Sequence, residues 1–132
     1  EIENFVKTKK NCYFVRNFGE SYYDILANVD CVLGNSSSGI IEAPCFKIPT
    51  IDIGDRQNGR EKAASVVNIS LNKKKIELNI KKVLNKSFQK KIRGIKNPYM
   101  ISRNFSASSF IANKLKQFNF KKSKVKIFRD CI

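Results

Sequence analysis

The chain lacks histidine and tryptophan and has a single methionine among its 132 residues. Without histidine, these residues offer neither an imidazole base nor a Cys–His zinc site. The four cysteines, Cys12, Cys31, Cys45 and Cys131, form no CxxC pair, so their spacing argues against an all-cysteine zinc site. We therefore expect no metal ion and no cofactor, and we expect the cysteines to be buried, reduced thiols.

Long apolar runs are also missing. No run approaches the roughly 20 residues of a membrane-spanning helix, and the N-terminus has no basic-then-apolar signal pattern. We expect a cytoplasmic protein with no membrane partner. The chain begins at Glu1 rather than at a methionine, and its length suits one domain, so we expect it to be part of a longer protein.

Acidic residues are scarce in the second half. Residues 1–70 carry 8 Lys and Arg against 9 Asp and Glu, a net charge of −1, whereas residues 71–132 carry 18 against 2, a net charge of +16. A basic surface with interleaved aromatics is typical of nucleic-acid binding. Lys-rich helices with solvated outer faces explain the same excess, and no nucleic-acid motif is present. We favour the solvated helices and keep a basic nucleic-acid-binding module as the alternative.

Short apolar segments alternate with segments of helical periodicity. The expected strands are 11–15, 30–33, 48–53 and 65–69, and the expected helices are 20–28, 37–46, 73–84, 87–95 and 105–118. The residues expected to face inward in helix 73–84 are Ile76, Ile80, Val83 and Leu84. This alternation predicts an α/β fold, a Rossmann-like parallel sheet with flanking helices. We expect one domain over residues 1–118 and a basic tail over 119–132.

The first polar segment, GNSSSGIIEAP at 34–44, runs from a strand into a helix through a turn rich in serine. Unpaired N–H groups at a helix start suit a phosphate or pyrophosphate, and the hydroxyls of Ser36, Ser37 and Ser38 add donors. Glu42 repels phosphate but can accept hydrogen bonds from two ribose hydroxyls. The same residues also fit a plain helix cap followed by a surface carboxylate.

The second polar segment, GDRQNGRE at 54–61, is a glycine-bearing loop after another strand. Arg56 and Arg60 suit a diphosphate because a guanidinium donates hydrogen bonds in a fork. Surface arginines paired with Asp55 or Glu61 are the alternative. Both segments follow strands of a parallel sheet, so we expect them to share its ligand-binding edge.

Together these two blocks resemble the sugar-nucleotide 2-epimerases of sialic and legionaminic acid biosynthesis. The spacing between the blocks also fits, and two shorter segments, NFGESY at 17–22 and KNPY at 96–99, resemble elements of that family. The resemblance covers about residues 12–99 and implies the C-terminal half of a two-domain, GT-B-like enzyme. The partners it implies are a UDP-sugar substrate and a second, N-terminal domain, with a homo-oligomer left open.

The resemblance also implies roles for individual residues. Ser36 and Ser37, with Ser38 beside them, would bind the diphosphate, and Glu42 would bind the ribose. The remaining implied UDP contacts are Arg56 and Arg60 in the loop and Asn17 and Tyr22 beside the base. The proton-transfer carboxylates of the family lie in its N-terminal domain, so no catalytic acid or base is expected in this chain.

The family reaction begins with anti elimination of UDP, which leaves a glycal. Hydrolysing members then add water and release N-acetylmannosamine, whereas non-hydrolysing members add UDP back. NSSSG and GDRQNGR are similar to the hydrolysing branch. The alternatives are a non-hydrolysing epimerase and a glycosyltransferase nucleotide domain. The substrate stays open between UDP-N-acetylglucosamine, a diacetamido relative and a GDP-linked sugar.

Overall fold

The computed structural model describes residues 1–100 and 106–118, and the chain forms two compact units, 1–100 and 101–132. Each unit is described by itself. The basic tail predicted over 119–132 lies outside the described residues, and the domain boundary predicted at residue 118 stays a prediction.

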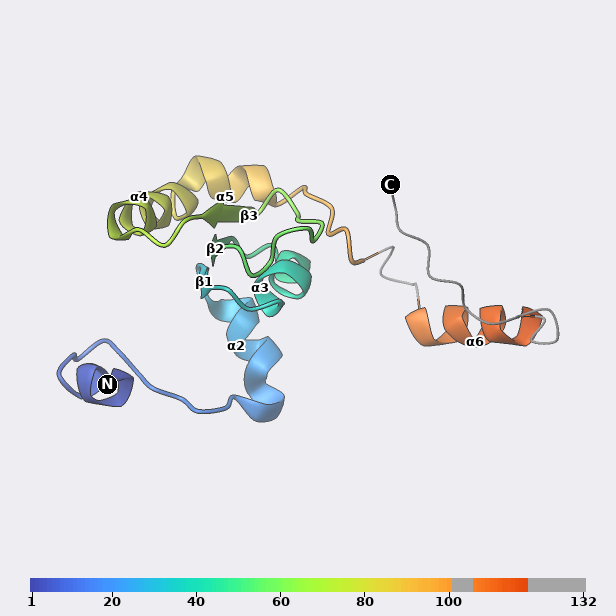
Figure 1. Ribbon diagram of the computed structural model, residues 1–132, viewed down its shortest axis with the longest axis horizontal. Coiled ribbons are helices and arrows are strands. Elements are labelled where there is room, and N and C mark those ends of the chain that lie inside the picture. Colours follow the sequence, from blue (N-terminus) through green and yellow to red (C-terminus); the bar gives the residue numbers. More distant parts are fainter. Residues whose placement is uncertain (101–105, 119–132) are drawn as a thin grey trace. The chain divides into compact units, whose positions relative to one another are not determined.

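A three-stranded parallel sheet lies at the centre of the first unit (Figure 1). Its strands are β1 (Val32–Gly34), β2 (Thr50–Ile53) and β3 (Val66–Ile69), in the spatial order β1-β2-β3. In the register, Leu33 lies beside Ile51, and Ile51 beside Val67. Helices cover both faces, so the predicted Rossmann-like α/β fold is confirmed.

One face of the sheet carries the apolar core. Ile51 and Ile69 pack against Val83 of helix α4 (Lys73–Val83), and Phe88 of helix α5 (Lys86–Ile92) joins the same cluster. Ile76 and Ile80 also pack there, as the periodicity predicts. The prediction for Leu84 is wrong: it follows the last turn of α4 and its side chain is 46% exposed.

The opposite face is covered by helix α3 (Ser38–Ile41), which contacts β1 and β2 (Figure 1). Helix α2 (Tyr22–Asn28) packs against the 3-10 helix η2 (Ala43–Phe46), which follows α3. On this face the hydroxyl of Thr50 donates to the carbonyl of Gly39 at 2.7 Å. A Cβ on Gly39 would lie 2.6 Å from the Thr50 methyl group, so only glycine allows this approach between helix and strand.

The single helix predicted over 37–46 is interrupted at Glu42. Helix α3 ends at Ile41, and η2 continues from Ala43 with Pro44 in its first turn. Proline has no N–H to donate back to the carbonyl of Ile40, and its ring crowds that carbonyl, so a regular α-helix cannot pass through this point. Glu42 therefore lies at a junction between two short helices.

The segment before the sheet differs most from expectation. The strand predicted over 11–15 is wrong, because these residues adopt no regular structure and Tyr13, Phe14 and Val15 are exposed. A β-prone sequence forms a strand only where a neighbouring strand accepts its hydrogen bonds. Helix α1 (Ile2–Lys7), which was not predicted, precedes the segment, and the 3-10 helix η1 (Gly19–Ser21) leads into α2.

In the second unit, helix α6 (Ala107–Gln117) falls within the helix predicted over 105–118. Ser106 caps it by accepting a hydrogen bond from the N–H of Ser109. Among residues 1–100 and 106–118, no helix is both long enough and apolar enough to cross a bilayer.

Candidate functional site

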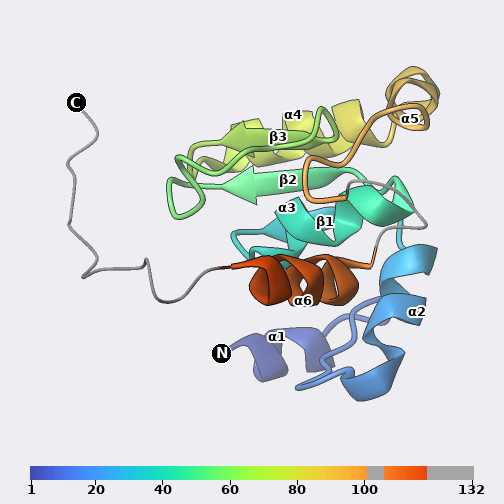
Figure 2. The same ribbon diagram turned by 90° about the vertical axis from the view of Figure 1, so that its right-hand side faces the viewer.

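Two loops leave the carboxyl ends of β1 and β2, and we call them the serine turn (34–38) and the arginine loop (54–62). Because β1 and β2 are parallel neighbours, both loops emerge at the same end of the sheet. Figure 2 shows the arginine loop beyond the arrowhead of β2. Gly54 and Gly59 have φ angles of +86° and +75°, which favour glycine.

Direct hydrogen bonds join the two loops. The side-chain amide of Gln57 donates to the backbone carbonyl of Asn35 at 2.7 Å, and Arg56 donates to the Asn35 side chain at 3.5 Å. Gln57 is only 3% exposed, so its bond is protected from water. The predicted meeting of the two segments at one edge is confirmed, with Arg56 beside the serine turn.

Within the serine turn, the hydroxyl of Ser36 accepts a hydrogen bond from the N–H of Ser38 at 3.3 Å. Ser37 is the N-cap of α3, but its side chain makes no capping bond. The dihedral angles of Ser37, φ −61° and ψ −26°, are already helical, whereas a capping side chain needs extended backbone. In the described part of the chain, the N–H groups of Ser36 and Ser37 donate to no protein group, so both can bind a ligand.

Tyr22 and Glu42 border the same turn. The Tyr22 hydroxyl is hydrogen-bonded to the hydroxyl of Ser38, which ties α2 to the start of α3. Glu42 follows Ser38 by four residues in helical conformation, so both side chains lie on one side of α3. One carboxylate oxygen of Glu42 is buried and has no hydrogen-bond partner among the described residues, so Glu42 is not a plain surface carboxylate. One side-chain oxygen in each of Asp52, Gln57 and Ser65 is buried without a partner in the same way.

The structure does not draw Asn17 and Arg60 into these contacts. The Asn17 side chain accepts a hydrogen bond from the N–H of Gly19 at 2.8 Å, a local turn, and it is exposed. Arg60 is exposed on the arginine loop. Within the described residues, neither Arg56 nor Arg60 forms an ion pair with Asp55 or Glu61, which is contrary to the surface-pair alternative.

A buried polar group beneath the arginine loop was missed by the sequence reasoning. Asp52, 1% exposed, binds the ammonium of Lys62 at 3.0 Å and the amide of Asn68 at 2.9 Å. Asn68 also donates to the carbonyl of Gly54 at 2.8 Å. These bonds hold both ends of the loop to the sheet. The available signal was an aspartate inside an otherwise apolar strand, because buried carboxylates need a partner.

Cys12, Cys31 and Cys45 are free thiols, and for these three the prediction of burial is wrong, because Cys45 is exposed and the other two are partly buried. Cys131 lies outside the described residues. Burial raises the pKa of the Cys31 thiol, and the nearby Asp30 adds to this, against a backbone hydrogen bond from Ile51. In residues 1–100 and 106–118, no cluster of three or more His, Cys, Asp or Glu side chains could hold a metal ion.

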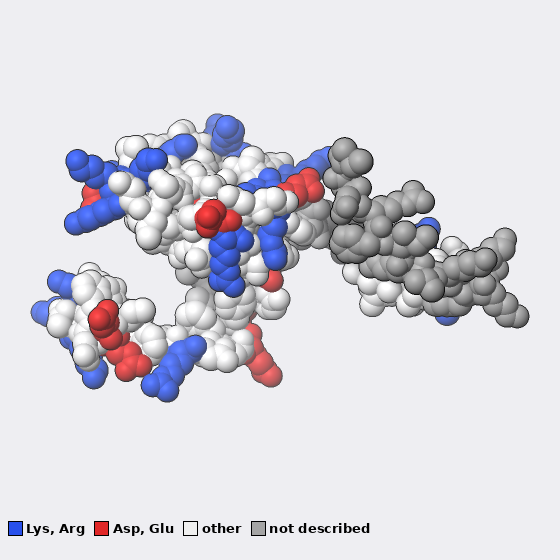
Figure 3. Space-filling view, viewed as in Figure 1, with Lys and Arg blue, Asp and Glu red and all other residues white. Residues whose placement is uncertain are grey.

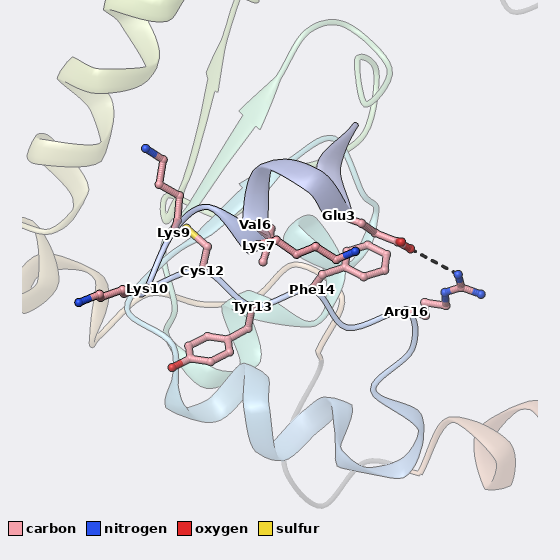
Figure 4. A pocket seen from close by; sticks show the side chains of 9 residues that line it. All are labelled: Glu3, Val6, Lys7, Lys9, Lys10, Cys12, Tyr13, Phe14 and Arg16. Carbon is pink, nitrogen blue, oxygen red and sulfur yellow. Dashed lines mark hydrogen bonds and ion pairs between the residues drawn. The ribbon is translucent and has the colours of Figure 1, made fainter.

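A hollow of about 710 Å³ lies elsewhere, between α1 and the segment that follows it (Figure 4). Its walls are mostly exposed side chains, among them Lys7, Lys9 and Lys10. The bond drawn in Figure 4 joins Arg16 to Glu3 at 3.3 Å on the surface. An open hollow with exposed walls fixes no ligand geometry, so the loops at the sheet edge are the candidate site.

Comparison with known proteins shows what the chain is similar to in sequence. Polysialic acid biosynthesis protein P7 of Escherichia coli is 35% identical over 99 residues, which are 75% of this chain and 25% of that protein. The hydrolyzing UDP-N,N'-diacetylbacillosamine 2-epimerase of Legionella pneumophila is 43% identical over 65 residues, 49% of this chain and 17% of the enzyme. The hydrolyzing GDP/UDP-N,N'-diacetylbacillosamine 2-epimerase of Campylobacter jejuni is 42% identical over 53 residues, 40% of this chain and 14% of the enzyme.

The chain therefore spans a quarter or less of the length of these relatives. The family model described as UDP-N-acetylglucosamine 2-epimerase matches residues 1–116, almost the whole chain. The serine turn and the arginine loop both fall inside the matched range. On this match, the chain belongs to the UDP-N-acetylglucosamine 2-epimerase family.

Proposed function

We propose that this chain is the UDP-binding part of a hydrolysing 2-epimerase in nonulosonic (sialic or legionaminic) acid biosynthesis. The reaction converts UDP-N-acetylglucosamine and water into N-acetylmannosamine and UDP, or does the same on a diacetamido sugar nucleotide. Two relatives named as hydrolyzing epimerases support the hydrolysing branch. Another relative is named for polysialic acid biosynthesis, which supports the pathway class.

The observation that carries the proposal is the bond from Gln57 to the carbonyl of Asn35, which joins the two loops. It brings Arg56 beside a turn in which, among the described residues, the N–H groups of Ser36 and Ser37 donate to no protein group. We assign the diphosphate to Ser36, Ser37, Ser38 and Arg56, with Arg60 as a second cation at the loop. The nucleoside contacts in the proposal are Glu42 for the ribose, and Asn17 and Tyr22 for the base.

The chemistry of these groups fits a departing nucleoside diphosphate. As the bond between the sugar C1 and the diphosphate oxygen breaks, negative charge grows on the leaving group. Donors fixed around that oxygen stabilise the transition state more than the substrate. Arg56 supplies a charged donor and the serine turn supplies N–H and O–H donors. Removal of the sugar proton and addition of water would fall to residues outside this chain.

Three finer points belong to the same proposal. A non-hydrolysing epimerase and a GDP-linked substrate are the alternatives, and one relative is named for both GDP and UDP sugars. A glycosyltransferase nucleotide domain and a homo-oligomer also stay open. We place the protein in the cytoplasm, because Cys12, Cys31 and Cys45 are free thiols and reducing compartments keep thiols in that state.

Calorimetric titration of the chain with UDP tests the proposal, with GDP and a short RNA as competing ligands at two salt concentrations. Saturable UDP binding that is lost in Arg56→Ala is the expected result. Arg93→Ala, which removes the same charge from an exposed position at the end of α5, is the matched control and should leave binding unchanged. RNA binding with a steep salt dependence and no response to UDP would instead favour the basic nucleic-acid module.

Turnover gives a second test. The chain alone should release no N-acetylmannosamine from UDP-N-acetylglucosamine, because the proposal assigns proton transfer to residues outside it. Product release by the chain alone, measured by chromatography against a no-enzyme control, would contradict that division of labour.

A further inference from the structure

The KNPY element at 96–99 is a motif that the proposed nucleotide site does not use. Asn97 of this element is only 6% exposed. Both the amide nitrogen and the amide oxygen of its side chain are hydrogen-bonded to protein groups. The amide donates to the carbonyl of Ile41 at 2.8 Å and to the sulfur of Cys45 at 2.9 Å. The amide oxygen accepts a hydrogen bond from the N–H of Tyr99 at 3.0 Å.

The carbonyl of Ile41 needs this outside donor because α3 ends there. In a continuous α-helix, the N–H of Cys45 would donate to Ile41. It donates to the carbonyl of Glu42 instead, at 2.8 Å, in the tighter pattern of η2. Apart from a long contact of 3.6 Å from the Cys45 thiol, Asn97 supplies the donor for this carbonyl.

The hydrogen bond from Asn97 to the carbonyl of Ile41 also restrains the backbone of Glu42. The carbonyl of Ile41 and the N–H of Glu42 belong to one planar peptide, so holding one holds the other. Glu42 lies at the junction of two short helices, where the regular α-helical ladder stops. With its backbone held by Asn97, Glu42 stays in helical conformation four residues after Ser38, and one of its carboxylate oxygens is buried without a hydrogen-bond partner among the described residues.

We infer that Asn97 is a positioning residue that sets the orientation of Glu42 for its ligand through the Ile41–Glu42 peptide. The inference rests on the proposed function, because it requires Glu42 to contact the nucleotide. Asn97 is 6% exposed and its side chain is bonded to protein groups, so we expect it to affect binding through Glu42 and not by contact with the nucleotide.

A double-mutant cycle on the chain tests this, with UDP affinity measured by calorimetry. Asn97→Ser keeps an oxygen that can accept from the N–H of Tyr99 but is too short to reach Ile41. We expect it to weaken UDP binding about five-fold, within the coupling seen between residues that share a contact. In a Glu42→Gln background, Asn97→Ser should weaken UDP binding less than about two-fold, because the side chain that Asn97 positions has already lost its charge.

The control is Asn85→Ser, the same substitution at the exposed N-cap of α5, which should leave UDP affinity unchanged in both backgrounds. Equal losses from Asn97→Ser in both backgrounds, or no loss in a folded variant, would overturn the inference and leave the nucleotide site standing. If the unchanged chain does not bind UDP, the proposed function itself fails. If circular dichroism shows that Asn97→Ser does not fold, Asn97→Gln replaces it in the double-mutant cycle, because it displaces the same amide donor. The same two outcomes then support or overturn the inference.

Discussion

Two regions of the chain use polar residues in opposite ways. One is the site edge, formed by the serine turn and the arginine loop. The other is the basic layer, formed by α4 and α5. At the site edge, Gln57 is buried and bonded to the serine turn, and the buried Asp52 of β2 is bonded to Lys62 of the arginine loop. In the basic layer, the lysines are all exposed: Lys73, Lys74, Lys75, Lys81, Lys82, Lys86, Lys90 and Lys91. Figure 3 shows Lys and Arg side chains standing out over this part of the surface.

This difference shows that a region with a high net charge need not hold its charged side chains in fixed positions. The side chains of Asp52 and Gln57 are each held by hydrogen bonds to a specific protein group, whereas exposed lysines are held loosely by water. A hollow of about 570 Å³ in the basic layer is lined by Leu78, Phe88 and three lysines. Its lysines form no ion pair within the described residues. Exposed lysines attract anions without fixing one binding geometry, so the proposal assigns the diphosphate to the site edge and not to the basic layer.

Lys62→Met should have the largest effect, because it leaves the Asp52 carboxylate buried without its ion partner. We expect a loss of about 2 to 3 kcal/mol in the free energy of unfolding, below the full value for a buried pair because Lys62 is 21% exposed. Lys82→Met, at an exposed position on α4, should change stability by less than about 0.5 kcal/mol. Urea unfolding of both variants measures the difference, and equal effects would erase the contrast between the two regions.

Glu42→Gln should have the second-largest effect. We expect the free energy of UDP binding to weaken by about 1 to 3 kcal/mol, the scale of a hydrogen bond to a charged group. The substitution keeps the shape of the side chain and removes the charge that strengthens a bond to the ribose hydroxyls. Calorimetry gives the affinity and circular dichroism checks the fold. Unchanged affinity in a folded variant would remove Glu42 from the site edge.

The smallest effect concerns thiol reactivity. Cys45 is exposed on η2, whereas Cys31 packs against the core and burial raises the pKa of its thiol. At pH 8, iodoacetamide should therefore alkylate Cys45 several-fold faster than Cys31, since the thiolate is the reactive form. Mass spectrometry after proteolysis follows each cysteine separately. Faster labelling of Cys31 would show that this side of the sheet opens in solution.

Much of the fold could be predicted because its local signals agree. Apolar runs marked all three strands, and the spacing of Ile76, Ile80 and Val83 marked the buried side of α4. The predictions failed where the local structure depends on a neighbouring strand or on a single proline. Segment 11–15 has strand propensity but pairs with no strand, and Pro44 divides a segment whose apolar spacing still reads as one helix.

For the site, the order of segments predicted which loops meet but not how they are joined. The rule that parallel strands end at one edge brought Arg56 and the serine turn together. Nothing in the sequence indicated that Gln57 would bond the backbone of Asn35, or that Asn97 would bond that of Ile41. Such contacts cross long stretches of sequence and depend on three-dimensional packing. The resemblance gave residue roles, and those roles remain proposals until ligand binding is measured.

The central claim, that the two loops form one nucleotide site distinct from the basic layer, is tested most directly by NMR. Backbone amide shifts of the labelled chain would be followed as UDP is added. We predict one saturable process that moves the amides of Ser36, Ser37, Arg56 and Gln57 together and leaves those of α4 and α5 in place. Shifts confined to α4 and α5, with the serine turn and arginine loop unmoved, would contradict the account.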